Sequence, residues 1–202
     1  MAELEIKNIV GRKIERYKSK LKIKNIQLDV LLDFTNSINH DFSTSEVLEK
    51  FMHFVQEQLK IEKLVLFSKF AHWRCLLDYG LEEGELDLIN VTRDLLHLKE
   101  ITSVISIQND ALKNFDMVVP VYHGEKPLAY LLLGDVHNDE VSMSNIIKHL
   151  NFLQLLTNVV VSAIENNRLA IEVLKQEQER RKLMEHQNEI LEKLVNERTN
   201  AA

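Results

Sequence analysis

The scarcity of turn-forming residues constrains the possible folds of this chain more than any other feature of its sequence. Only five glycines and two prolines occur among its 202 residues, roughly a third of the usual share. Gly and Pro mark most turns and interrupt regular elements. A chain with so few of them is expected to consist of long helices and few loops.

Composition and charge indicate a folded domain rather than a disordered chain. Hydrophobic residues make up 45% and charged residues 28% of the sequence, enough apolar material to form a core. The net charge is −6, yet residues 1–24 hold eight Lys/Arg against three Asp/Glu. This basic segment carries no nucleic-acid-binding motif, so it is interpreted as the solvated face of a helix. Contact with nucleic acid or anionic lipid is the alternative.

Three features predict a cytoplasmic protein without a membrane span. Cys75 is the single cysteine, which argues against an intramolecular disulfide framework. No apolar run approaches the roughly 18 residues that a transmembrane helix needs. Residues 1–13 carry charges throughout and are not expected to be a signal peptide.

Apolar residues at helical spacing predict two helices before residue 61. A helix over residues 3 to about 39 is predicted from a coiled-coil-like stripe that comprises Val10, Ile14, Tyr17, Leu21, Leu28, Leu31 and Ile38. Ser43 and Glu46 have the spacing of a capping box, with Phe42 and Val47 placed as a hydrophobic staple. A second helix is therefore expected from Ser43 to about Lys60.

Residues 61–136 change to the pattern of a sheet. Pro120 has no N–H to donate, so it is expected beside an edge, a bulge or a gap. The predicted strands are Lys63–Phe70, Trp73–Asp78, and a hairpin of Phe115–Tyr122 with Leu128–Val136. Between them the sequence predicts a strand edge at Leu86–Ile89, a helical turn at Thr92–Leu98 and a strand at Ile101–Ile107.

From about Ser142 to the end the pattern is helical again. Its apolar stripe comprises Ile146, Leu150, Leu153, Val160, Ile164, Ile171 and Leu174. Beyond Leu174 the stripe becomes polar at Gln178 and Arg181 before it resumes in a shifted position. A single domain of this size cannot cover so long a helix, so roughly the last 30 residues are expected to pair with another helix.

Catalytic chemistry has little support in these residues. The chain contains neither a Gly-rich nucleotide loop nor a G-x-S-x-G motif. Cys75 lies in a predicted strand, where a packing role is favoured over that of a nucleophile. The acidic segment 135–140 is interpreted as a polar connection rather than a metal site. His186 is interpreted as a coiled-coil position rather than a phosphoacceptor, because Gln187 follows it. Neither enzyme activity nor a metal site is predicted.

Several segments resemble GAF domains in their order and spacing. The run T-N-V-V-V-S-A-I-E-N-N-R-L at 157–169 is similar to the closing helix of that family. Val119–Gly124 followed by Pro127–Gly134 looks like its hairpin. Leu31–Ile38 and Ser43–Leu59 match its two opening helices. The resemblance covers about residues 28–169. Within the family, the chain resembles the N-terminal GAF segments of bacterial signalling proteins.

The resemblance implies an α+β fold: a six-stranded antiparallel sheet with helices on its faces and a pocket on one side. It implies an N-terminal helical extension at 1–27, a GAF domain at 28–169 and a coiled-coil signalling linker at 170–202. Similar GAF segments precede PP2C-type phosphatases, and residues 188–199 resemble linkers into histidine kinase or class III cyclase domains. Residues 134–140 lack the Asn-Lys and Phe of the cyclic-nucleotide motif, so the cofactor or ligand stays unknown.

The resemblance and the apolar stripes together predict the functional residues. A small-molecule ligand is expected near Phe67, Trp73 and Cys75, with Arg93 and His97 from the segment between the second predicted strand and the hairpin. The alternative is that Phe67 and Trp73 only fill the core. A homodimer is expected through a parallel helical bundle that comprises Val10, Ile14, Tyr17, Leu21, Val160, Ile164, Ile171 and Leu174.

The favoured function is a regulatory sensory and dimerisation module of a cytosolic bacterial signalling protein. In this interpretation the helical linker relays the state of the core to a C-terminal output domain. A ligand-free structural scaffold is the alternative, and a catalytic domain has the least support. A nucleic-acid partner is not expected.

Overall fold

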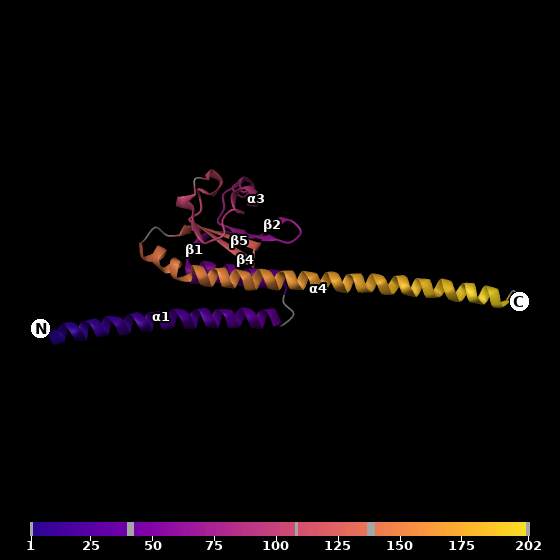
Figure 1. Ribbon diagram of the computed structural model, residues 1–202, viewed down its shortest axis with the longest axis horizontal. Helices are drawn as coiled ribbons and strands as arrows, with labels where there is room; N and C mark the ends of the chain where they lie inside the picture. Colours follow the sequence, from indigo (N-terminus) through magenta and orange to yellow (C-terminus); the bar gives the residue numbers. More distant parts are fainter. Residues whose placement is uncertain (1, 40–42, 108, 137–139, 201–202) are drawn as a thin grey trace. The chain divides into compact units, whose positions relative to one another are not determined.

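The structure, a computed structural model, describes residues 2–39, 43–107, 109–136 and 140–200 (Figure 1). Residues up to Val161 form one compact unit and residues from Ser162 form a second. The main elements are α1 (Ala2–Asn39), α2 (Thr44–His53), β1 (Ile61–Lys69), β2 (Trp73–Tyr79), α3 (Val91–Asp94), β3 (Thr102–Ser103), β4 (Met117–His123), β5 (Lys126–Val136) and α4 (Glu140–Asn200). The two long helices confirm the expectation from the scarcity of Gly and Pro.

The start of α2 follows the predicted capping chemistry. The Ser43 N–H donates to Glu46 Oε2 at 2.9 Å, and the Glu46 N–H donates to Ser43 Oγ at 3.2 Å. These reciprocal bonds satisfy two backbone donors that a helix N-terminus otherwise leaves open. Phe42, the other half of the predicted staple with Val47, lies outside the described residues. A π-helical turn, Phe54–Gln58, continues α2 toward β1.

The described strands form one antiparallel sheet in the order β2-β1-β5-β4-β3. The predicted hairpin is confirmed: Val119 pairs with Leu131 and Pro120 with Tyr130, around a turn that contains Gly124 at φ +60°. In the part of the chain that the structure describes, β3 pairs only with Met117 and Val118. Pro120 therefore lies beyond the end of β3, where no ladder needs its missing N–H.

The prediction of six strands is wrong for the described residues, which form five. The expected strand edge at Leu86–Ile89 is instead a 3₁₀ turn over Leu86–Leu88. It leads into α3, where Asn90 Oδ1 accepts from the Arg93 N–H at 3.0 Å as an N-cap. The expected strand at Ile101–Ile107 is limited to Thr102–Ser103, because Val104–Ser106 turns into a 3₁₀ helix. The Ser106 hydroxyl closes that turn by donating to the Ser103 carbonyl at 2.6 Å.

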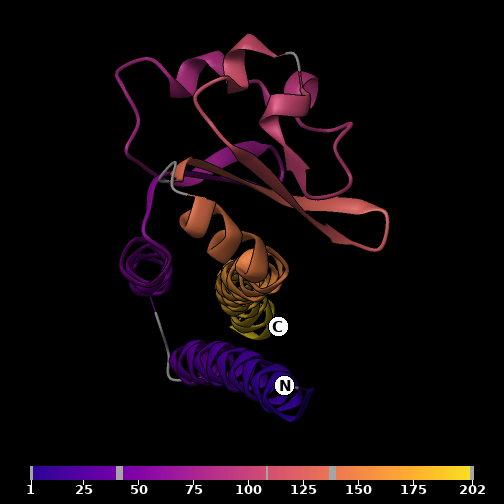
Figure 2. The ribbon, with the colours of Figure 1, turned by 90° about the vertical axis from the view of Figure 1, so that its left-hand side faces the viewer.

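The sheet buries apolar side chains on both faces, as the alternation of side chains along a strand allows. Figure 2 shows the sheet between the first turns of α4 and the segment that joins β2 to β4. Leu64, Leu66 and Leu131 are fully buried on one face. On the helical side of the molecule, Phe54 and Phe152 meet edge to face with ring centroids 5.8 Å apart.

One stretch of α4 is apolar enough, by length and composition, to cross a membrane. An 18-residue window within Ile147–Lys193 has a mean hydropathy of 1.2, and half of that window is buried inside the chain. A core helix of a water-soluble domain passes the same test, so this is weak evidence for a span. The absence of a membrane span and the cytoplasmic location stay predictions.

Candidate functional site

Three of the five predicted ligand residues lie together on one face of the sheet. Phe67 projects from β1, and Trp73 and Cys75 from the neighbouring β2. Phe67 is buried in an apolar cluster, against which the half-buried Trp73 and Cys75 pack. Strand pairing accounts for this proximity, since Phe67 lies directly opposite Cys75 in the antiparallel register.

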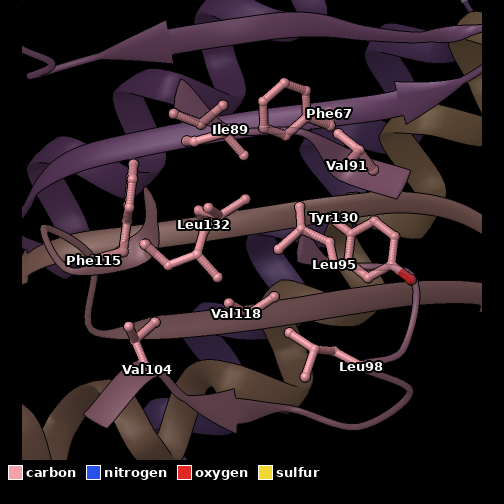
Figure 3. Packing of buried hydrophobic residues seen from close by; sticks show 12 residues of the cluster. Phe67, Ile89, Val91, Leu95, Leu98, Val104, Phe115, Val118, Tyr130 and Leu132 are labelled. Carbon is pink, nitrogen blue, oxygen red and sulfur yellow. The ribbon is translucent and has the colours of Figure 1, made fainter. Parts of the chain in front are cut away.

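The space over this face of the sheet is filled by apolar side chains. Leu95 and Leu112 are fully buried there, and Val104 is buried to 5% exposure. Figure 3 shows the side chains of Ile89, Val91, Leu95 and Leu98 around Phe67, Tyr130 and Leu132. This packing favours the alternative that Phe67 and Trp73 fill the core. The ligand pocket itself stays a prediction.

Polar atoms at the edge of the cluster bind one another. The hydroxyls of Tyr122 and Tyr130 are 2.9 Å apart, and the Tyr122 hydroxyl donates to the Leu98 carbonyl at 3.5 Å. Burial raises the pKa of Tyr130 well above its ordinary value. The Trp73 ring lies 5.5 Å from the Tyr130 ring. These contacts explain the positions of Tyr122 and Tyr130 as part of the folded core.

Arg93 does not reach the aromatic residues but pairs with its sequence neighbour. Its Nε donates to Asp94 Oδ1 at 2.7 Å and its Nη2 to Asp94 Oδ2 at 2.9 Å. The Asp94 carboxylate also accepts from the Asn90 N–H at 2.7 Å and from Asn109 Nδ2 at 3.1 Å. The Arg93 hydrogen bond lowers the pKa of Asp94 to about 2. This network holds the segment between β2 and β4 in place.

Cys75 and His97 show no sign of a reactive arrangement. Burial, followed by the nearby Asp78 carboxylate, raises the pKa of the Cys75 thiol to about 11. The thiol therefore stays protonated at neutral pH and is a poor nucleophile. The His97 side chain is exposed. The acidic segment 135–140 lies outside the described side chains.

A cavity that the sequence did not indicate lies between α1 and α2. Its volume is about 640 Å³, and its lining includes Phe34 and Phe54 together with Asp33 and Glu49. Helical spacing alone predicted that α1 and α2 have apolar faces. It carried no information on how closely the two helices approach, because that depends on tertiary packing.

Comparison with known proteins identifies the fold. No family model and no curated protein matches the chain. A solved GAF domain of a protein assigned as a sensor histidine kinase from Pseudomonas syringae pv. tomato matches with a TM-score of 0.51 and 15% identity, over 78% of this chain and 97% of that one. The GAF domain of an Acinetobacter phosphoenolpyruvate-protein phosphotransferase matches with a TM-score of 0.50 and 17% identity, over 72% and 96%. The chain has a GAF fold.

The predicted dimer residues of this GAF-fold chain differ in exposure. Ile14, Tyr17 and Leu21 of α1 are 48%, 66% and 63% exposed. Val160 and Ile164 of α4 are 0% and 4% exposed, so a partner cannot reach them without a rearrangement. Ile171 and Leu174 of α4 are 62% and 63% exposed. The side chain of Val10 lies outside the described part of the chain.

Proposed function

We propose that this GAF-fold chain is a regulatory module of a signalling protein and that it acts as a homodimer. The fold supports this proposal, since the two solved relatives are named as GAF domains of a sensor histidine kinase and of a phosphotransferase. Residues 188–199 resemble linkers into histidine kinase or class III cyclase domains, which supports one of these as the output domain. The resemblance to GAF segments that precede PP2C-type phosphatases supports a phosphatase as the other choice.

The observation that carries the proposal is the change in burial along α4. Leu153, Leu156 and Val160 are fully buried. Beyond residue 168 the large apolar side chains that the structure describes are exposed, and they comprise Leu169, Ile171, Val173, Leu174, Leu183, Met184, Ile190, Leu191 and Val195. Large apolar residues at helical spacing on an uncovered helix indicate a surface that pairs with another helix.

A second copy of the chain is the proposed partner for this surface. Ile171 and Leu174 are three residues apart, so they lie on the same face of α4 and form the α4 stripe. The net charge of residues 165–202 is only −1, from seven Lys/Arg and eight Asp/Glu, so a like-charged copy is not strongly repelled. The exposed α1 residues Ile14, Tyr17 and Leu21 join the same parallel bundle. Val160 and Ile164 have no part in it, because they are already buried.

Sedimentation analysis of two matched variants tests the proposal. Ile171→Glu places a carboxylate in the α4 stripe and is expected to weaken the dimer at least tenfold, since desolvating an unpaired charge is costly. Val173→Glu is the control: Val173 is 64% exposed but lies about 200° around the helix from Ile171. Equal effects of the two variants, or a monomeric parent chain at tens of micromolar, would contradict the proposal.

The filled face of the sheet favours a second form of this function, in which the core binds nothing and the chain only dimerises. Leu95 and Leu112 occupy space that a ligand over Phe67 would need. Native mass spectrometry of the chain purified from its own host separates the two forms. A bare mass supports the scaffold, whereas a small molecule that Leu95→Trp displaces supports sensing through this face.

A further inference from the structure

The cavity between α1 and α2, here called the α1–α2 cavity, combines an apolar floor with a charged rim. Phe34 from α1 and Phe54 after α2 line it and are only 3% and 6% exposed. Ile26 and Val30 of α1 extend the apolar lining. Its volume of about 640 Å³ lies within the range of sites that hold small organic ligands.

Carboxylates dominate the rim of the α1–α2 cavity. Asp29 and Asp33 come from α1, and Glu46 and Glu49 from α2. Hydrogen bonding by Ser43, first from its backbone N–H and then through its hydroxyl, lowers the pKa of Glu46, so this group is ionised at neutral pH. Lys50, the one Lys or Arg among the described lining residues, donates to the Ser37 hydroxyl.

The spacing of these acids is unfavourable for the helices themselves. Asp29 and Asp33 are four residues apart, and Glu46 and Glu49 are three apart, so like charges are neighbours on each helix surface. Such pairs of like charges destabilise a helix slightly. A bound cation would relieve this repulsion on both helices at once.

The size of the cation follows from how the carboxylates are distributed. Among the described residues no group of three or more His, Cys, Asp or Glu side chains is arranged to hold a metal ion. The four carboxylates thus surround the cavity without converging on one point. A cation large enough to lie on the apolar floor can approach several of them, whereas a small metal ion cannot.

We propose that the α1–α2 cavity binds a small organic cation with an apolar body. The apolar body would cover Val30 and Phe34, and the charge would face Asp29, Asp33 and Glu49. This site is separate from the face of the sheet that carries Phe67, and it does not depend on dimerisation. A ligand held there would contact both α1 and α2, and so could stabilise one arrangement of these two helices.

A pair of dyes with one ring framework and opposite charge tests the proposal. Rhodamine 6G is a lipophilic cation, and fluorescein is an anion at neutral pH. Fluorescence anisotropy is expected to show saturable binding of rhodamine 6G with one site per chain and no saturable binding of fluorescein. The double variant Asp29→Asn with Asp33→Asn is expected to weaken rhodamine binding by about two- to thirtyfold, as for the loss of two exposed ion pairs.

Two further variants separate the α1–α2 cavity from general attraction to an acidic chain. Glu83→Gln with Asp87→Asn removes the same charge at exposed positions outside the cavity and is expected to leave binding unchanged. Val30→Trp fills the cavity without changing charge and is expected to abolish binding, with circular dichroism confirming that the helices persist.

Three results would overturn the proposal. One is the absence of saturation by rhodamine 6G up to about a hundred micromolar, a range that covers weak small-ligand sites. Another is equal weakening by the two charge-neutralised double variants. The third is loss of rhodamine 6G binding as the chain dimerises, with binding restored by Ile171→Glu. That result would mean that a second copy of the chain occupies the α1–α2 cavity. The first two results do not bear on the sedimentation test, and the third requires a dimer, so the cavity proposal can fail while the dimer proposal stands.

Discussion

Lys63 on β1 donates to both carboxylate oxygens of Glu85, at 3.2 and 3.3 Å, and the two side chains are only 8% and 5% exposed. Glu85 belongs to the loop after β2, where its Oε2 also accepts from the Glu82 N–H at 2.9 Å. Burial alone would raise the pKa of Glu85, but hydrogen bonds from Glu82, Asn114 and Lys63 outweigh it and lower the pKa. The pair fastens the loop after β2 to β1, an interior strand of the sheet.

Glu85→Gln is expected to destabilise the chain by about 3–5 kcal/mol, because it removes one charged partner of a buried ion pair. Urea unfolding measures the loss. Lys63→Met combined with Glu85→Leu removes both charges and is expected to recover most of it. A single variant as stable as the parent chain would show that the pair is not buried in solution.

Asp94 is expected to make stability depend on pH in the acid range. Its pKa in the folded chain, about 2, lies below the ordinary value of 3.8, so the unfolded chain takes up a proton first as pH falls. The stabilisation is complete above the ordinary value and is lost as pH falls toward 2, amounting to at most about 2 kcal/mol. Asp94→Asn should flatten the change in urea midpoint over this range, and an unchanged slope would contradict the assignment.

Two glycines provide a matched test of the loop geometry. Gly80 has φ +71°, and a Cβ there would lie 2.0 Å from the Glu62 carbonyl oxygen. Gly84 has φ +80° but open space around it. Both substitutions by Ala cost backbone strain, and Gly80→Ala is expected to cost about 1–3 kcal/mol more because the backbone must also move. Thermal unfolding compares the two, and equal losses would refute the close approach.

The sequence predicted the elements whose periodicity extends over many residues. The stripe through Tyr17 and Leu21 predicted α1, and the capping box at Ser43 and Glu46 fixed the start of α2. The hairpin around Gly124 was predicted for the same reason, since its two strands are long and apolar. Each of these signals is local, so tertiary packing did not need to be known.

The segment between β2 and β4 could not be predicted in the same way. Its apolar runs, such as Leu86–Ile89, are too short for periodicity to separate a strand from a turn. Side-chain bonds decide the outcome there, such as the cap that Asn90 provides for α3. The burial of Ile164 and the cavity beside Phe34 depend on how whole elements pack together. An apolar stripe in the sequence therefore could not distinguish a core residue from a residue that pairs with another helix.

Disulfide trapping tests the central claim, parallel pairing of α4 in a homodimer, most directly. Two helices in parallel register bring Leu174 of one copy opposite Leu174 of the other, within disulfide distance. In a Cys75→Ala background, Leu174→Cys is expected to give a covalent dimer under mild oxidation, whereas Val173→Cys on another face stays monomeric. Equal crosslinking at both positions, or none at Leu174→Cys, would contradict the account.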